Sequence, residues 1–129
     1  MSVIILAGSA KDREHVKKIS DKLDELKIKW DNFYASAHKN PLEVLKILET
    51  YQNEKALVYI TIAGRSNALS GFVAANSQFP TLACPPFADK MDMMVNIHST
   101  LQMPSQVPAM TVLDPGNCAL AAARILNLK

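Results

Sequence analysis

Residues 56–67 read Ala-Leu-Val-Tyr-Ile-Thr-Ile-Ala-Gly-Arg-Ser-Asn, an apolar and β-branched run that ends in a polar turn. Such a run predicts a strand buried on both faces, as in a parallel sheet. Apolar residues at helical spacing follow, so Gly64–Asn67 is expected to lead from this strand into a helix. Amides that open a helix bind anions, and Arg65, Ser66 and Asn67 add a charge and two hydrogen-bonding side chains. The alternative is an ordinary N-cap beside a solvated arginine.

Length and composition predict a single soluble globular domain over residues 1–129. The chain is 49% hydrophobic and 20% charged, with a net charge of +2 and two cysteines. A charge this small gives no indication of a nucleic-acid partner, and no apolar run approaches the ~20 residues that span a bilayer. The first residues run directly into a strand-like pattern without a signal peptide. We therefore expect a cytoplasmic protein with reduced thiols and no membrane partner.

Strand-like and helix-like patterns alternate five times along the chain. This rhythm predicts an α/β fold, with a five-stranded parallel sheet covered by helices on both faces. Crossovers in such a sheet are right-handed, so the carboxyl ends of all strands share one edge. The expected strands are residues 3–7, 28–34, 56–63, 79–84 and 109–113.

Two helical patterns carry specific expectations about their apolar side chains. In the pattern that begins at Asn40-Pro41, Leu42, Leu45 and Leu48 are expected to form the buried face, with Tyr51 at its end. In the pattern between residues 91 and 101, the apolar residues are expected to form core or subunit contacts. These residues are Met91, Met94, Val95, Ile97 and Leu101.

Polar residues with chemical potential gather in the turns that follow strands. Ligands of open α/β sheets bind at that edge, and the opposite turns are plainer, so the asymmetry predicts a site. Each turn also has a structural explanation, such as a capping box from Ser9 to Asp12. The turns hold Gly8, Ser9 and Asp12; Ser36, His38 and Lys39; Gly64, Arg65, Ser66 and Asn67; and residues 85–90.

The side chains in these turns suit a phosphorylated or carboxylated ligand. Lys39, Arg65 and the helix-start amides attract such groups, and Asp12 can accept hydrogen bonds from sugar hydroxyls. His38 has an intrinsic pKa near neutrality that suits proton transfer. Its alternative is a histidine on a surface loop.

Other reactive residues are expected to play smaller parts. His15 and His98 lie within helical patterns and are interpreted as bystanders. Cys84 precedes two prolines near the predicted site, but no histidine partner is evident, so a buried structural thiol is the favoured interpretation. Histidine and carboxylate spacings do not match a metal site, and Gly-rich nucleotide motifs are absent.

Five separated motifs resemble the aminoimidazole ribonucleotide (AIR) carboxylase family of purine biosynthesis, over nearly the whole chain. The family fold is a three-layer α/β/α sandwich of flavodoxin-like type, usually assembled as an octamer. Members either move a carboxylate within N-carboxyaminoimidazole ribonucleotide or carboxylate AIR directly with carbon dioxide. The motifs are Gly8-Ser9-x-x-Asp12, Ser36-Ala37-His38-Lys39, Ala63-Gly64-Arg65-Ser66-Asn67, Cys84-Pro85-Pro86 and Gly116-Asn117-x-Ala119-x-x-Ala122-Ala123.

Three departures from the mutase pattern favour the direct carboxylase. The mutase motifs usually have arginine where Lys39 stands, a glycine-alanine run where residues 65–67 stand, and a second histidine where Ala68 stands. Two departures touch the family as a whole. A serine usually precedes the aspartate where Lys11 stands, and the C-terminal extension that often reaches a neighbouring subunit is shorter here.

The resemblance implies a role for each site residue. His38 matches the catalytic histidine, and Lys39 and residues 64–67 are expected to stabilise the carboxylate. Ser9, Asp12 and Ser36 are expected to hold the ribose phosphate, and Gly8 lies in the same motif. The implied partners are the ribonucleotide, carbon dioxide and further copies of the chain in a homo-oligomer, with no metal or organic cofactor. The remaining alternatives are the mutase and a non-catalytic flavodoxin-type module that binds a phosphorylated ligand.

Overall fold

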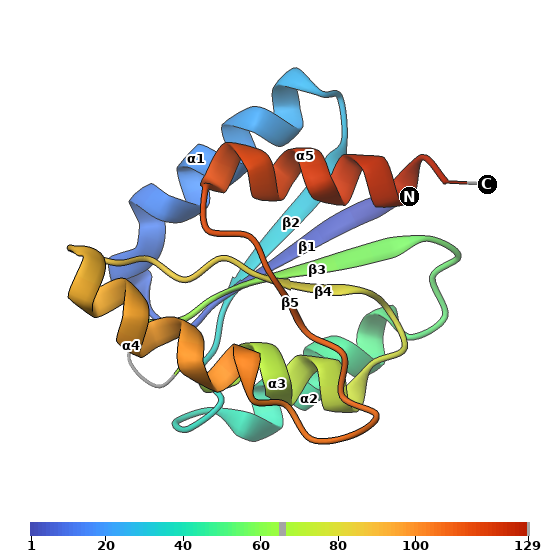
Figure 1. Ribbon diagram of the computed structural model, residues 1–129. Helices are drawn as coiled ribbons and strands as arrows, with labels where there is room; N and C mark the ends of the chain where they lie inside the picture. The colour runs from blue at the N-terminus through green and yellow to red at the C-terminus, as the bar shows by residue number, and fades with distance from the viewer. Residues whose placement is uncertain (65–66, 129) are drawn as a thin grey trace.

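The computed structural model describes residues 1–64 and 67–128. Five parallel strands form one sheet in the order β2-β1-β3-β4-β5. This order, with helices on both faces, is the doubly wound flavodoxin-like arrangement, which confirms the predicted fold class (Figure 1). The strands are β1 (Ser2–Ala7), β2 (Lys29–Tyr34), β3 (Leu57–Ile62), β4 (Thr81–Ala83) and β5 (Met110–Thr111).

The helices lie in two layers, one on each side of the sheet (Figure 1). The helices α1 and α5 contact each other and cover one face, whereas α2 and α3 cover the other, with α4 against α3. A short 3-10 turn, η1 (Ala10–Asp12), precedes the first helix. The helices are α1 (Arg13–Glu25), α2 (Pro41–Tyr51), α3 (Ala68–Asn76), α4 (Lys90–Leu101) and α5 (Pro115–Leu126).

The two central strands divide the core into two clusters. Because side chains alternate along a strand, Ile5 and Ile60 pack beneath α1 and α5, whereas Ile4 and Tyr59 pack beneath α2 and α3. All six residues of both β1 and β3 are buried. The continuous apolar run around β3 therefore predicted its place correctly.

The predicted buried face of α2 is wrong in two of its three leucines. Leu42 is 79% exposed and Leu45 lies at the surface, whereas Val44, Ile47 and Leu48 are buried. Leu42 and Leu45 are three residues apart, and so are Val44 and Ile47, and Leu48 can join either pair on a helical face. The pattern alone therefore allowed two faces. The position of the sheet selects the second one.

The helix α4 does not bury the apolar residues that its pattern singled out. Met91, Met94, Val95 and Leu101 are exposed, and the buried residues of the helix are Asn96 and Thr100. The expectation of core contacts is therefore wrong for these four residues. Subunit contact remains a prediction.

The last two strands are shorter than predicted. Prolines at 80, 85 and 86 bracket β4, and proline cannot donate to the ladder of hydrogen bonds. β5 lies at the edge of the sheet and keeps two residues in the ladder. Among the described residues, no helix is both long and apolar enough to cross a membrane.

We expect Tyr59→Phe to leave stability at neutral pH unchanged or raise it by up to about 1 kcal/mol. The Tyr59 hydroxyl is buried and has no hydrogen-bond partner within the described part of the chain, so its removal costs nothing. Burial, with a smaller effect of Tyr51, raises the pKa of Tyr59 to about 12. In the unfolded chain the tyrosine hydroxyl ionises near pH ~10. The free energy of unfolding of the wild type therefore falls as pH rises from ~10 to ~12, and Tyr59→Phe should lose less of its stability over this range.

Denaturant titrations at neutral pH and between pH ~10 and ~12 measure both effects. The control is Ile60→Ala, which removes buried apolar groups beside Tyr59 and should cost about 2–5 kcal/mol. If Tyr59→Phe lost as much stability as Ile60→Ala, the Tyr59 hydroxyl would have a hydrogen-bond partner after all, and the expectation would be wrong.

Candidate active site

The turns that follow the strands begin side by side at the carboxyl edge of the sheet. Hydrogen bonds run from the amide of Gly8 to the carbonyl of Ile62 (2.8 Å) and from Ala35 to Ala7 (2.9 Å). β2 lies on one side of β1, and β3 lies on its other side, so the direction in which strands are added to the sheet reverses at β1. Ligands of such sheets bind where the strand order reverses, so the turns after β1 and β3 flank the expected crevice.

The turn after β1 combines a local cap with a partly buried carboxyl. The Ser9 hydroxyl accepts a hydrogen bond from the amide of Lys11 (3.2 Å), and the Asp12 amide donates to the Ser9 carbonyl (3.0 Å). Ser9 therefore caps this turn, as the alternative interpretation of the sequence predicted. Burial raises the pKa of Asp12, while His15 and the hydrogen bond with Ser9 oppose the rise.

The turn after β2 is organised by a serine. The Ser36 hydroxyl accepts hydrogen bonds from the amides of His38 and Lys39, both at 3.2 Å. The Asn40 side-chain oxygen accepts from the Ser36 amide (3.3 Å), which closes the loop. The side chains of His38 and Lys39 are exposed at this edge. Ser36 therefore holds the loop that presents the histidine, and its own hydroxyl proton is still available to a ligand.

The turn after β3 is described only at its ends. Gly64 is half-buried and Asn67 is completely buried, while Arg65 and Ser66, two of the predicted substrate contacts, lie outside the described residues. Asn67 occupies the N-cap position of α3, but its side chain does not cap the helix and instead donates to Thr100 on α4. The simple N-cap interpretation is therefore wrong for its side chain.

Three helices begin at this edge without a side-chain cap from their N-cap residue. Asp12, Asn40 and Asn67 make no such bond at the starts of α1, α2 and α3. By contrast, Asp89 and Asp114 cap α4 and α5. Uncapped amides and the helix dipole favour an anion. The three uncapped starts follow three of the four turns that the sequence singled out, and the fourth, residues 85–90, leads into the capped helix α4.

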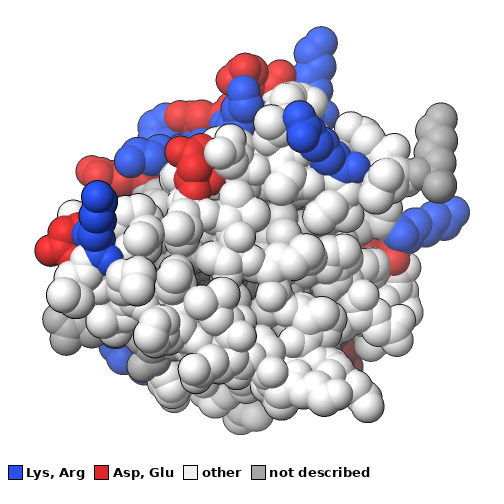
Figure 2. Space-filling model, viewed as in Figure 1, with Lys and Arg blue, Asp and Glu red and all other residues white. Residues whose placement is uncertain are grey.

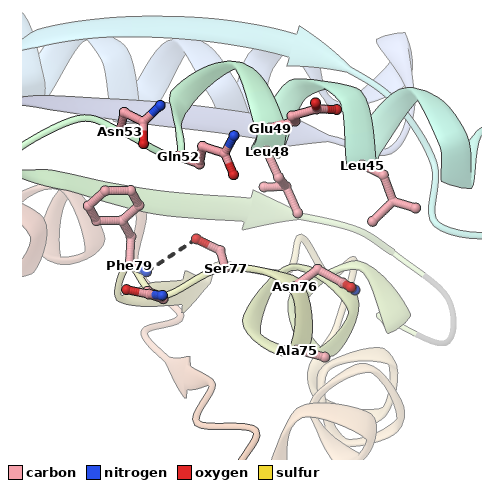
Figure 3. Close-up of a pocket in the computed structure, with 10 residues that line it drawn as sticks. Leu45, Leu48, Glu49, Gln52, Asn53, Ala75, Asn76, Ser77 and Phe79 are labelled. Carbon is pink, nitrogen blue, oxygen red and sulfur yellow. Dashed lines mark hydrogen bonds between the residues drawn. The ribbon is translucent and has the colours of Figure 1, made fainter.

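Cavities lie at both edges of the sheet. One of about 510 Å³ lies at the carboxyl edge and is lined by Gly64, Asn96 and residues 86–89 and 92. A larger one of about 640 Å³ lies between α2 and α3 at the opposite edge, where Figure 3 shows Leu45, Leu48 and Phe79 around it. The larger cavity contains none of the predicted site residues. In the part of the chain that the structure describes, no group of three or more His, Cys, Asp or Glu residues could hold a metal ion.

His15 has a contact that the sequence interpretation missed. Its Nε2 lies 3.4 Å from the Sγ of Cys84, so the cysteine has a histidine neighbour and His15 is not a bystander. A hydrogen bond with the Cys118 thiol lowers the pKa of Cys84; burial raises it, and His15 adds to the lowering. His15 lies one helical turn before the buried Ile19. This spacing puts His15 on the inner face of α1, and it was a signal in the sequence that could have predicted the contact.

The comparisons with known proteins identify the family. A family model described as AIR carboxylase matches residues 2–129. The chain belongs to the AIR carboxylase family. Phosphoribosylaminoimidazole carboxylase of Archaeoglobus fulgidus is 46% identical over 129 residues, which cover all of this chain and 71% of the relative. The enzyme of the same name from Treponema denticola is 45% identical over 127 residues, which cover 98% of this chain and 79% of the relative.

A bifunctional animal relative and a crystal structure extend the match. The Drosophila melanogaster phosphoribosylaminoimidazole carboxylase/succinocarboxamide synthetase is 39% identical over 98% of this chain, which is 29% of that protein. The crystal structure of Treponema denticola PurE superposes with a TM-score of 0.90 and 45% identity, covering 95% of this chain and 78% of that chain. Both the predicted family and the predicted fold are confirmed. The roles of the individual site residues stay predictions.

We expect the Cys84 thiol to titrate below the ordinary cysteine value of about 8.5. Thiolate absorbance in the ultraviolet measures this midpoint, because the hydrogen bond to Cys84 and burial raise the pKa of Cys118, so that Cys118 does not contribute to the signal. His15→Leu and Cys118→Ala should each move the midpoint upward. Cys84→Ala is the control that removes the signal, and a wild-type midpoint at or above the ordinary value would contradict this assignment.

Proposed function

We propose that this protein carboxylates AIR with carbon dioxide to 4-carboxyaminoimidazole ribonucleotide (CAIR) and catalyses the reverse decarboxylation. The observation that carries the proposal is the match of nearly the whole chain to relatives named phosphoribosylaminoimidazole carboxylase. The carboxyl edge supports it, because an exposed histidine, an exposed lysine and three uncapped helix starts follow neighbouring strands.

The proposed chemistry needs one base and a cationic environment. The ring carbon beside the exocyclic amine attacks carbon dioxide; a carbon–carbon bond forms and one C=O electron pair moves to oxygen as a carboxylate. The ring carbon still carries its proton, which His38 accepts so that the ring regains aromaticity. In the reverse direction His38 returns the proton. Ser36 fixes the backbone of His38 and Lys39 through two hydrogen bonds, and this holds the loop that carries both side chains.

Binding of the ribonucleotide is assigned to the same edge. Lys39 and residues 64–67 are proposed to stabilise the new carboxylate, and Ser9, Asp12 and Ser36 to hold the ribose phosphate. The raised pKa of Asp12 reflects its partial burial. With its two free cysteines, the enzyme is proposed to act in the cytoplasm.

The decisive assay supplies purified protein with AIR and bicarbonate, without ATP or a second enzyme. Formation of CAIR supports the carboxylase. Turnover of N-carboxyaminoimidazole ribonucleotide alone would establish the mutase instead. Binding of the ribonucleotide without any ring carboxylation, or a yellow flavin-containing preparation, would favour a binding module.

We expect His38→Asn to lower kcat by about 100-fold or more while ribonucleotide binding persists, because a general acid–base group is lost. Steady-state kinetics and calorimetric titration with AIR separate the two effects. The control is Lys17→Gln, which changes an exposed side chain on the charged surface of α1 and should retain activity. Near-normal turnover in His38→Asn would remove His38 from the mechanism.

We also propose that the protein assembles into a homo-oligomer through α4, in keeping with an octamer. Figure 2 shows that charged side chains gather over α1 and α5 and at the start of α4, whereas the surface over α3 and the rest of α4 is almost uncharged. Met91, Met94, Val95 and Leu101 are exposed there. Exposed apolar patches of this kind mark interaction surfaces.

We expect Val95→Glu to dissociate the assembly, because a buried unpaired charge in an apolar contact is unfavourable. Val95 is 61% exposed in the isolated chain, so the folded monomer should tolerate the substitution. Light scattering measures the mass of both proteins. Lys18→Glu, on the charged surface of α1, is the control that should leave the mass unchanged. A monomeric wild type, or a Val95→Glu variant of wild-type mass, contradicts the proposal.

A further inference from the structure

The inner face of α4 is polar where a packed helix is ordinarily apolar. Asn96 and Thr100 are 1% and 3% exposed, and they lie one turn apart on the same face. Amphipathic helices usually turn their apolar stripe inward. Buried polar groups are stabilised only by partners, so the contacts of this face show what it holds.

The contacts form a closed ring of hydrogen bonds around Asn67. The Asn67 side-chain amide donates to the Thr100 hydroxyl, and the Ser70 hydroxyl donates to the Asn67 carbonyl (3.3 Å). The hydroxyls of Ser70 and Thr100 lie 3.1 Å apart. The Ser70 hydroxyl has a single proton, which it donates to the Asn67 main-chain carbonyl, so in the pair of hydroxyls Thr100 is the donor and Ser70 the acceptor. Thr100 therefore accepts one bond and donates another, and both bonds lead back to Asn67.

The backbone of Asn67 is held from further directions. Its amide donates to the Gly64 carbonyl (2.8 Å), and its carbonyl also accepts from the Ser99 hydroxyl (3.2 Å). Asn67 has a left-handed backbone, with φ of 40°. Asparagine tolerates this region better than most residues, but such conformations persist only where their surroundings fix them. Ser99 and Thr100 of α4 provide that constraint.

The same helix also contacts the turn after β4. The Asn96 side-chain amide donates to the Pro86 carbonyl (3.0 Å). Asn96, Gly64 and Pro86 line the cavity of about 510 Å³ at the carboxyl edge. The inner face of α4 thus contacts two turns that border one cavity.

We propose that Thr100 is a positioning residue: through its hydrogen bond with Asn67 it fixes Asn67 and the first amides of α3 in the geometry that the carboxylation reaction needs. Ser70 and Ser99 complete this support. The inference rests on the proposed AIR carboxylation, since it assigns a role in the same site. Thr100 is buried against α3 and does not itself face a ligand.

The test compares three variants of nearly equal size. Thr100→Val keeps the shape and removes the hydroxyl, and it should lower kcat/KM for AIR about 10- to 100-fold, the range for a misplaced reacting geometry. Thr100→Ser keeps the hydroxyl and should recover most of this loss. Thr81→Val makes the same change at a completely buried threonine at the start of β4, on the opposite edge, and should leave kcat/KM unchanged.

Thermal unfolding of each variant separates positioning from stability. A purely structural role predicts that Thr100→Val and Thr81→Val lower Tm alike and that kcat/KM, measured well below Tm, stays at the wild-type value in both. That result would overturn the proposal. Loss of activity in Thr100→Ser as deep as in Thr100→Val would overturn it as well.

A second variant covers the case in which Thr100→Val fails to fold. Ser99→Ala removes one hydrogen bond to the Asn67 carbonyl from a half-buried position, and it should lower kcat/KM by a smaller factor with little change in Tm. An unchanged kcat/KM in Ser99→Ala would then count against the proposal. If the wild type itself forms no CAIR, the proposed function fails, and that result is distinct from failure of the positioning role.

Discussion

The parallel pairing of β1 with β3, buried on both faces, is the constraint on which the rest of the structure depends. The register joins Ser2 to Leu57 and Ala7 to Ile62. Every side chain of both strands is buried, so a slip of one residue would exchange the two core faces. This register sets the turns after β1 and β3 next to each other, and it places the reversal of strand order between them.

The candidate site follows from this pairing by short local steps. The turns after β1, β2 and β4 begin directly after the strand, and the first amide of each is still bonded to the neighbouring strand: Gly8 to Ile62, Ala35 to Ala7 and Cys84 to Thr61. Beyond that point serine hydroxyls take over: Ser9 caps a turn and Ser36 holds the His38 loop. The strands thus position the loops that carry the site residues, which is the usual arrangement of functional residues.

The helix α4 reverses the ordinary distribution of polar and apolar groups, and both of its faces fit the proposed function. Its polar residues contact the turns after β3 and β4, where main-chain groups need partners. Its apolar residues remain on the surface, where a second copy of the chain is proposed to cover them. A single helix would then connect the assembly of the protein to the geometry of its site.

The sequence alone determined the alternating α/β order, the parallel sheet and the edge that carries the polar turns. These follow from local periodicity and from the handedness of crossovers, which need no knowledge of distant contacts. The family resemblance was likewise available from the motifs around His38 and Asn67.

Only the tertiary structure decided which of two equivalent faces a helix buries and which distant residues meet. Leu42 and Val44 belong to competing faces of α2, and the sheet selects Val44. The contacts between His15 and Cys84, and between Asn67 and Thr100, join residues 69 and 33 positions apart. No local pattern encodes such pairs, because they depend on how separate helices lie against the sheet.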